Sequence, residues 1–330
     1  MFGMRVLNSK TRREDVMFIK SILFGILAYF LTTFVGVMKV ESQLRVNTQF
    51  AEVNQITVAY RYYKSADNYQ KNFVFLHGFA GSSADWDLLV KELRKFGNCL
   101  LIDIPPFGMS EKRIDFDYSD ANLIKTILLL LDMLEIKKFS LIGHSMGGNL
   151  AIQIASTVPD RIEKLVLVSA AYIPLERDDS RLVEVLKNGN RFWIGNLEDE
   201  NLSTILNLGL KTYPMIRTIY SNLVPNLDRV RQVHLDRLFA QNVFLPAEVL
   251  IKFSKDKIEQ PPLGFDLGKI SAETLIIYGS NDNITPPVLG EYLSRKIKNS
   301  RLELIDGEGH LPMLDKKFVE IVVQFFKEQE

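Results

Sequence analysis

A serine held between glycines constrains this chain more than any other feature. Residues 139–144 form a short apolar run, typical of a buried strand, that leads directly into Ser145. Residues 149–155 have the apolar spacing of a helix. Gly143 and Gly147 stand two residues on either side of the serine. A G-x-S-x-G segment between a strand and a helix is typical of a nucleophile elbow, the sharp turn that carries a reactive serine.

The two glycines follow from steric limits. The turn is tight, so a side chain two residues before or after the serine would collide with the neighbouring strand or helix. The strained turn holds the Ser145 hydroxyl at the tip of the sheet, and the first N–H groups of the following helix point toward it. A G-x-S-x-G segment also occurs by chance in glycine-rich loops. The strand before it and the helix after it favour the elbow.

A serine hydroxyl is a weak nucleophile at neutral pH and needs a base, usually a histidine oriented by a carboxylate. The chain has four histidines. His144 is held next to the serine within the elbow and cannot turn onto it, His77 directly follows a strand-like run, and His234 lies in a polar helical stretch that predicts a surface position. His310, on a glycine-flanked loop after another strand-like run, is the predicted base.

The orienting carboxylate is expected at the end of another strand, between the serine and His310 in chain order. Asp282 follows a strand-like apolar run and is the predicted acid. Aspartate also forms turns and caps helices, so Asp282 has a structural alternative. Other positions stay open as the acid: Asp306, which lies on the same loop as the histidine, and the pair Asp178 and Asp179 after an earlier strand.

Stabilisation of a developing oxyanion requires N–H donors near the serine. The residue after the serine, Met146, supplies one from the main chain. A second donor is expected from the loop after a central strand, and the strand-like run 72–76 leads into His77-Gly78-Phe79. We therefore predict the backbone N–H groups of Phe79 and Met146 as the oxyanion donors.

Together these motifs resemble the α/β-hydrolase family, and the resemblance covers nearly all of residues 45–330. The matching segments are His77-Gly78-Phe79, the loop 103–110 that reads Asp-Ile-Pro-Pro-Phe-Gly-Met-Ser, the elbow 143–148, Gly-x-x-Asp282-x-x-x-Pro286 and Gly-x-Gly-His310. Pro106 stands where the family's second loop usually has glycine. The resemblance implies an α/β-hydrolase fold in which Ser145, Asp282 and His310 match the nucleophile, the acid and the base.

The elbow also narrows the chemistry that the resemblance implies. Epoxide hydrolases and haloalkane dehalogenases of this fold carry an aspartate at the position of Ser145, so the serine implies acyl transfer. His144 resembles the G-H-S-x-G of esterases and monoacylglycerol lipases, whereas carbon–carbon bond hydrolases of the family more often have asparagine there. The single glycine of the 77–79 loop differs from the H-G-G-G loop of another lipase group.

Short apolar runs alternate with helical stretches, which predicts a mostly parallel sheet with helices on both faces. The expected strands are 73–76, 99–102, 139–142, 165–169, 275–278 and 302–305, after an opening hairpin at 45–63. Residues 172–270 break this rhythm with a leucine-rich helical pattern, where the family inserts a helical cap. Aromatic residues and Met215 in this segment are expected either to line an acyl pocket or to hold the cap helices together.

The N-terminal segment predicts a membrane anchor. Residues 21–38 are uncharged and apolar, and extension to 17–40 gives a helix long enough for a ~30 Å hydrocarbon core. Arginines and lysines precede it, which predicts a cytoplasmic tail at 1–16 and a catalytic domain on the opposite side of the membrane. The alternatives are a cleaved signal peptide, whose apolar region is usually shorter, and a buried core helix.

Composition limits the other classes of function. The 330 residues suffice for one large α/β domain with an insertion. The 40 Lys and Arg residues balance 40 Asp and Glu residues and no basic face is evident, so nucleic acid is not an expected partner. No group of Cys and His residues has metal-binding spacing, and Cys99 alone cannot form an intrachain disulfide. We expect neither a metal nor a cofactor.

The sequence as a whole predicts a membrane-anchored serine hydrolase that cleaves carboxylic esters through an acyl-enzyme. The anchor and the leucine-rich cap favour a lipid-derived ester, such as a monoacylglycerol. Two alternatives stay open. An acceptor other than water can resolve the acyl-enzyme, as in an acyltransferase or a perhydrolase. The chain can also be a ligand receptor that keeps the three residues and turns over slowly.

Overall fold

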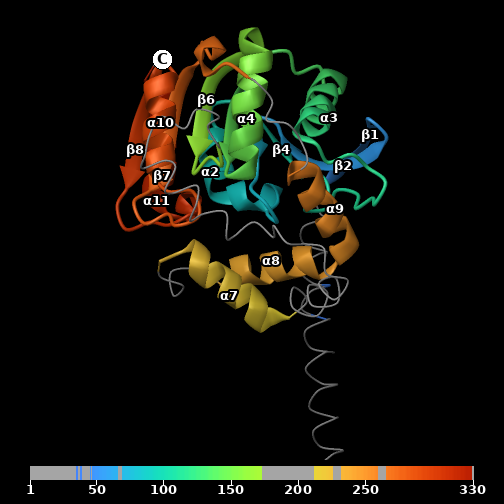
Figure 1. Ribbon diagram of the computed structural model, residues 1–330. Coiled ribbons are helices and arrows are strands. Elements are labelled where there is room, and N and C mark those ends of the chain that lie inside the picture. Colours follow the sequence, from blue (N-terminus) through green and yellow to red (C-terminus); the bar gives the residue numbers. More distant parts are fainter. Residues whose placement is uncertain are drawn as a thin grey trace, which may run out of the picture.

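In a computed structural model of the chain, eight strands form one sheet among the residues that the structure describes. These residues are 47–65, 69–172, 212–225, 232–258 and 265–328, with the single residues Val35, Met38 and Arg45. The strands are β1 (Gln49–Val53), β2 (Ile56–Tyr63), β3 (Asn72–Leu76), β4 (Asn98–Ile102), β5 (Phe139–His144), β6 (Ile162–Val168), β7 (Glu273–Gly279) and β8 (Ser300–Ile305). Their order across the sheet is β1-β2-β4-β3-β5-β6-β7-β8 (Figure 1).

The sheet begins with the predicted hairpin. β1 pairs antiparallel with β2, and β2 pairs antiparallel with β4, whereas the pairs from β4–β3 to β7–β8 are parallel. Asn54 and Gln55 join the first two strands with φ angles of 51° and 68°. Two connecting residues at positive φ form the type I′ turn, whose twist matches that of the strands. The hairpin prediction is thus confirmed.

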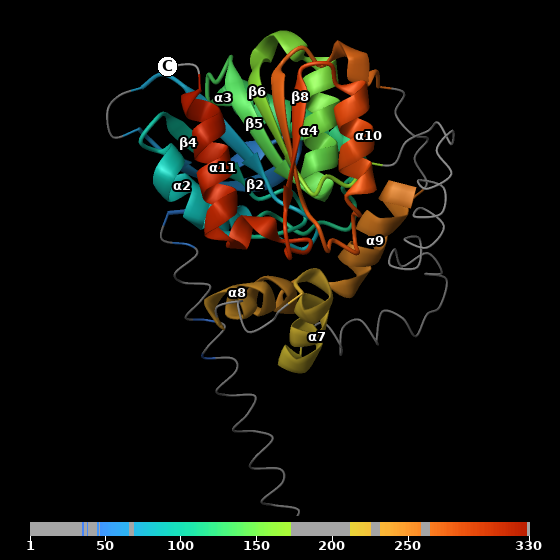
Figure 2. The same cartoon turned by 90° about the vertical axis from the view of Figure 1, so that its left-hand side faces the viewer.

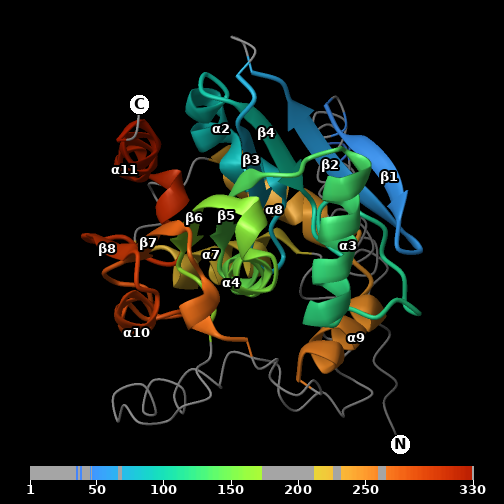
Figure 3. The same cartoon turned by 90° about the horizontal axis from the view of Figure 1, so that it is seen from above.

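Helices cover both faces of the sheet. α3 (Asp120–Met133), α4 (Met146–Thr157) and α10 (Val288–Lys296) lie on one face, and α2 (Asp87–Leu93) and α11 (Lys316–Lys327) lie on the other (Figure 3). The predicted α/β architecture, with a mostly parallel sheet between two helical layers, is therefore confirmed.

The central strands are apolar on both sides because both faces are covered. Leu141 and Leu165 belong to the core cluster that also holds buried residues of α3, α4 and α10. Their neighbours in sequence, Ile142 and Val166, belong to the second cluster, beneath α2 and α11. Consecutive strand residues point to opposite faces, so a strand buried on both sides appears in the sequence as an unbroken apolar run. Polar side chains are left to the ends of these strands.

Between β6 and β7, the described residues include three α-helices, which lie within the segment predicted as a cap. These cap helices are α7 (Tyr213–Leu223), α8 (Gln232–Val243) and α9 (Ala247–Ile258). Figures 1 and 2 show them on the side of the sheet where the parallel strands end. Residues 173–211 of the predicted cap lie outside the described residues. This range includes Asp178, Asp179 and Trp193.

Ion pairs and apolar contacts join the cap helices to the sheet domain. Arg237 of α8 pairs with Asp87 at 2.8 Å, and Lys257 of α9 pairs with Asp120 at the start of α3. The surface position predicted for His234 is wrong, because its residue is only 8% exposed on α8. A polar sequence pattern indicates that a helix can face solvent. In the folded chain, neighbouring elements cover the side of α8 that carries His234.

The membrane prediction concerns residues that the structure largely leaves undescribed. The predicted tail 1–16 and nearly all of the predicted anchor 17–40 lie outside the described residues. Within the part that is described, no helix has the length and apolarity needed to cross a membrane.

Candidate active site

Ser145 occupies a strained turn between β5 and α4. Its φ of 50° and ψ of −115° lie outside the regions that an L-residue normally adopts. Two main-chain contacts hold the turn: the Ser145 N–H donates to the Val168 carbonyl at 2.9 Å, and the Ser145 carbonyl accepts from the Ala171 N–H at 2.9 Å. Val168 is the last residue of β6 and Ala171 lies three residues beyond it, so the end of the neighbouring strand and the segment after it fix the position of the serine.

The glycines on either side of Ser145 are required by close main-chain contacts. A Cβ on Gly143 would overlap the carbonyl oxygen of Gly147 and lie 2.8 Å from Ala151 Cβ. A Cβ on Gly147 would overlap the carbonyl oxygens of Leu76 and His77. These are backbone atoms of the next helix turn and of the adjacent strand end, and they cannot move aside. The steric expectation from the sequence is confirmed at both positions.

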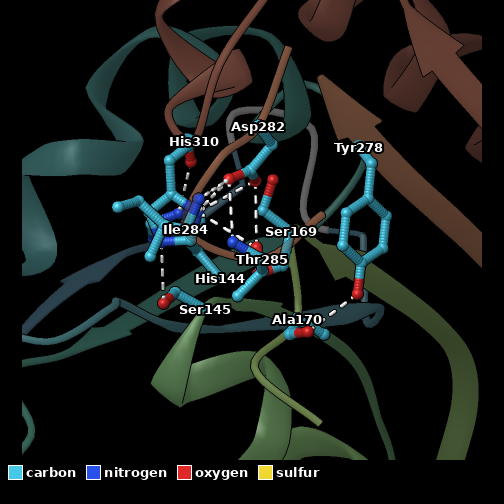
Figure 4. Close-up of polar contacts among 9 residues, drawn as sticks. All are labelled: His144, Ser145, Ser169, Ala170, Tyr278, Asp282, Ile284, Thr285 and His310. Carbon is cyan, nitrogen blue, oxygen red and sulfur yellow. Dashed lines mark hydrogen bonds and ion pairs between the residues drawn. The ribbon is translucent and has the colours of Figure 1, made fainter. Parts of the chain in front are cut away.

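The structure brings together the three side chains predicted as nucleophile, base and acid (Figure 4). Nε2 of His310 lies 2.9 Å from Ser145 Oγ, and Nδ1 lies 2.9 Å from Asp282 Oδ2 and 3.2 Å from Oδ1. An ionised carboxylate can only accept, so Nδ1 carries the proton and Nε2 accepts from the serine hydroxyl. The three residues come from the ends of β5, β7 and β8 and are all buried.

The Asp282 carboxylate accepts several hydrogen bonds from its own turn. Oδ1 accepts from the N–H groups of Ile284 and Thr285, each at 2.9 Å, and Oδ2 lies 2.9 Å from Thr285 Oγ1. Burial by itself would raise the pKa of Asp282. His310, the Thr285 N–H and the Ser169 side chain outweigh it and hold that pKa below its usual value. Asp282 therefore organises a turn, which is the structural alternative considered from the sequence, and its carboxylate also faces the imidazole.

The alternative acids do not meet His310 in the described structure. Asp306 is exposed, and its carboxylate lies 3.4 Å from the Ser280 hydroxyl. Asp178 and Asp179 lie outside the described residues. Among the four candidate carboxylates, Asp282 is the one with a described hydrogen bond to the imidazole.

The loop predicted to supply an oxyanion donor passes directly beside the serine. A Cβ on Gly78 would lie 3.1 Å from Ser145 Cβ. Buried His77 holds this loop: Nδ1 donates to the Gly78 carbonyl at 2.7 Å, and Nε2 accepts from the Ile104 N–H at 2.8 Å. The ring of Phe79 packs against Phe107, with ring centroids 5.1 Å apart. The His77 hydrogen bonds and the Phe107 ring thus hold Phe79 next to the elbow.

Met146 supplies its N–H from the first position of α4. The first N–H groups of a helix have no acceptor within the helix and point outward along its axis. With Gly78 and Phe79 beside Ser145, both predicted donors are close to the serine. Their role in binding an oxyanion remains a prediction.

Three neighbours of the site make contacts that the sequence did not predict. Thr285 contacts both Asp282 and His310, since its Oγ1 lies 3.1 Å from Nδ1 of the imidazole. His144, excluded as the base, places Nε2 at 2.8 Å from the His310 carbonyl. Leu223, the last residue of α7, accepts the His310 N–H at 2.8 Å. Only the aspartate-turn spacing gave a signal for Thr285, and no sequence pattern marks the Leu223 carbonyl.

Asp85 is a fourth unanticipated group, and it follows the loop that carries Phe79 in the chain. It lies in the 3₁₀ turn Ser83–Trp86 and accepts the Ser82 N–H at 3.1 Å. Burial raises the pKa of Asp85 to about 7, and the charges of Asp103 and Asp87 act in the same direction, against the Ser82 N–H and Arg237.

Within the described ranges, no three His, Cys, Asp or Glu side chains gather closely enough to hold a metal ion. The site consists of a hydroxyl, an imidazole, a carboxylate and main-chain N–H groups. This set can move a proton from a nucleophile and stabilise an adjacent negative charge.

Comparison with known proteins identifies the family. A model of the alpha/beta hydrolase fold matches residues 71–317, which is most of the chain. The chain belongs to the α/β-hydrolase fold family. The sheet order, the elbow and the interruption by helices between β6 and β7 are the features of this α/β-hydrolase that place the site.

Similar proteins include hydrolases with different named substrates. A 2-hydroxy-6-oxononadienedioate/2-hydroxy-6-oxononatrienedioate hydrolase of Pseudomonas putida is 25% identical, over 76% of this chain and 85% of that protein. The monoacylglycerol lipase ABHD6 of Rattus norvegicus is 27% identical, over 80% of this chain and 77% of that protein. Among solved structures, a bacterial membrane phospholipase A superposes with a TM-score of 0.71 at 20% identity, over 96% of this chain and 98% of that one. This last likeness concerns the fold alone.

The packing around the elbow predicts that Gly143→Ala destabilises this α/β-hydrolase. We expect the free energy of unfolding to fall by about 3 kcal/mol, because the added methyl meets main-chain atoms of α4. Urea unfolding followed by circular dichroism measures the change. Gly268→Ala is the matched control, since a methyl there meets the movable Asp266 carboxylate at 3.0 Å. Equal stability of the two variants would contradict the described packing.

The raised pKa of Asp85 predicts a pH-dependent stability. The unfolded carboxyl ionises near pH 4, whereas the folded one stays protonated up to about pH 7, so folding becomes less favourable between these values. Asp85→Asn keeps an acceptor for the Ser82 N–H and removes this titration. We expect its stability relative to the parent to increase by about 2–4 kcal/mol from pH 4 to pH 8. A stability difference that stays constant over this range in urea unfolding would refute the assignment.

Proposed function

We propose that this α/β-hydrolase is a serine hydrolase that cleaves carboxylic esters through an acyl-enzyme. The observation that carries the proposal is the unbroken hydrogen-bond chain from the Ser145 hydroxyl through His310 to Asp282. It lies beside main-chain N–H groups at the end of β5. A hydroxyl joined to a base whose other nitrogen is held by a carboxylate is the arrangement that activates a serine.

We assign a role to each group in the proposed reaction. Nε2 of His310 takes the proton as Ser145 Oγ attacks the ester carbonyl, and the N–H groups of Phe79 and Met146 stabilise the resulting oxyanion. By analogy, each such donor contributes about 3–4 kcal/mol to the transition state. The imidazolium then gives its proton to the leaving alcohol. Water repeats the two steps on the acyl-enzyme and releases the acid.

Asp282 supports this cycle by keeping one tautomer of His310. Its pKa is held below the usual value, so the carboxylate is ionised at neutral pH and accepts from Nδ1–H. The negative charge also stabilises the imidazolium that forms after proton transfer. The turn bonds from Ile284 and Thr285 keep the carboxylate from rotating away.

The surroundings support an uncharged, apolar ester. Two cations that reach the sheet domain from the cap helices, Arg237 and Lys257, are each paired with an aspartate. Phe79, beside the serine, presents a ring to solvent, with 38% of the residue exposed. A dicarboxylate, such as the substrate named for the Pseudomonas putida relative, needs cationic partners, whereas the apolar chain of a monoacylglycerol does not.

Substitution of the three polar residues tests the proposal. We expect Ser145→Ala to lower the turnover of a p-nitrophenyl ester by about 10⁶-fold, and Asp282→Asn by about 10⁴-fold. Asp306→Asn is the matched control: its carboxylate is on the same loop as His310 but lies against the Ser280 hydroxyl, with no described contact to the imidazole, so activity should equal that of the parent. Normal ester turnover by Ser145→Ala would exclude the serine as nucleophile.

Product analysis separates hydrolysis from the alternative uses of the same acyl-enzyme. The parent is incubated with a monoacylglycerol in the presence of a competing alcohol or of peroxide. Free fatty acid as the main product supports a hydrolase, and a new ester or a peracid indicates an acyltransferase or a perhydrolase. A ligand receptor would react with a fluorophosphonate probe at Ser145 but would turn over substrate very slowly.

We also propose that residues 17–40 anchor the enzyme in a membrane, with the N-terminus cytoplasmic. The support is the apolar composition of the segment and the basic residues before it. We expect the full chain to stay in the membrane fraction after a carbonate wash. The double variant Leu27→Arg and Leu31→Arg should move it to the soluble fraction, since each arginine costs about 3 kcal/mol within the bilayer. Equal membrane retention of both chains would count against an anchor here.

A further inference from the structure

The main chain of His310 is held from two opposite directions. Its N–H donates to the carbonyl of Leu223, the last residue of α7, at 2.8 Å. Its carbonyl lies 2.8 Å from Nε2 of His144, the residue before the serine. One contact comes from the cap helices and the other from the elbow. Figure 4 shows the second one, with the His144 ring between the elbow and the His310 main chain.

The protonation state of His144 follows from its partners. A carbonyl oxygen can only accept, so Nε2 of His144 carries the proton. Burial, followed by the proximity of His310, lowers the pKa of His144 to about 3, so the ring is neutral at physiological pH. Nδ1 faces the oxyanion loop, where a Cβ on Gly78 would lie only 2.6 Å away. His144 is therefore a fixed hydrogen-bond donor that neither charges nor reaches the Ser145 hydroxyl.

The His310 loop, residues 306–311, needs such support. Gly307 and Gly309 give its backbone more freedom than other residues would, and Gly307 has a φ of 74°. The contact between Nε2 of His310 and Ser145 Oγ is 2.9 Å, so a small displacement of the loop would break it. A shift of about 1 Å in a reacting group can reduce a rate about 100-fold.

The cap side of this support is closely packed. A Cβ on Gly309 would lie 2.6 Å from the Leu223 carbonyl oxygen and 2.9 Å from Pro225 Cδ. Leu223 and Leu311 pack together on the apolar cluster formed by Tyr220, Val224 and Leu235. The last carbonyls of a helix accept no hydrogen bond within the helix. The Leu223 carbonyl at the end of α7 can therefore accept one from the His310 N–H.

We propose that His144 is a positioning residue for the base: its Nε2–H fixes the His310 main chain from the elbow side, opposite the Leu223 carbonyl of the cap. The serine and the base are then linked twice, through the reacting hydrogen bond and through the His144 ring. The link through the His144 ring sets the length of the hydrogen bond between His310 and Ser145. This inference rests on the proposed function, because it concerns how His310 reaches Ser145.

The test compares two substitutions of similar length. His144→Gln keeps an N–H donor that can reach the His310 carbonyl, and His144→Met removes it. For p-nitrophenyl ester hydrolysis we expect His144→Met to lower kcat about 10- to 100-fold with KM within about threefold, and His144→Gln to restore most of kcat. Because His144 is neutral, the acidic limb of the kcat/KM profile should keep its position in both variants. The rate of fluorophosphonate labelling at Ser145 should fall in parallel with kcat.

A second variant tests the cap side without altering His144. Gly309→Ala would push the His310 loop away from Leu223, because the added methyl meets the Leu223 carbonyl oxygen, and we expect a fall in kcat at an assay temperature where circular dichroism shows the variant to be folded. Gly268→Ala, far along the chain from the His310 loop, is the control and should leave kcat unchanged. Gly309→Ala also keeps the proposal testable if His144→Met does not fold.

Several results would overturn the inference. It is wrong if His144→Met keeps the kcat of the parent, if His144→Gln is as impaired as His144→Met, or if Gly309→Ala has full activity. A shifted acidic limb would assign His144 an electrostatic role instead. Failure of the proposed function is distinguishable, because in that case the parent itself has no Ser145-dependent esterase activity.

Discussion

The strained turn at Ser145 is the constraint on which the rest of the site depends. Its positive φ is maintained because the serine N–H bonds to the last residue of β6 and the serine carbonyl bonds to Ala171 just beyond that strand. The packing of α4 against the ends of the neighbouring strands leaves no room for a side chain at Gly143 or Gly147. As a result, the Ser145 hydroxyl is held at the edge of the sheet, next to the first turn of α4.

Parallel strands bring the other groups to the same edge. β5, β7 and β8 end at the same edge of the sheet, with β6 between β5 and β7, so Asp282 and His310 reach Ser145 although each lies more than 130 residues after it in the sequence. Each side chain is then oriented by local main-chain bonds, such as those of the Asp282 turn. The sheet therefore sets the approximate positions, and the loops set the final distances of about 3 Å that proton transfer requires.

The cap helices take part in the site as well as covering it. α8 and α9 are joined to the sheet domain through Arg237 and Lys257, and α7 ends on the main chain of His310. A change in the position of the cap would thus reach the proposed base through the hydrogen bond from the His310 N–H to the Leu223 carbonyl and the packing of Leu223 around it. His144 provides the corresponding contact from the elbow.

The sequence by itself determined the elements whose signal is local. The elbow, the strand and helix runs, the hairpin and the family could all be predicted, because periodicity and glycine spacing report directly on backbone geometry. It also pointed to Asp282 and His310 by their places after strands, but it could not exclude Asp306. Only the tertiary structure showed that Asp282 contacts His310 whereas Asp306 contacts Ser280, that His234 is buried, and that the His310 main chain meets His144 and the Leu223 carbonyl. The physical reason is that such contacts depend on how distant segments pack, and a main-chain carbonyl looks the same at every position of the sequence.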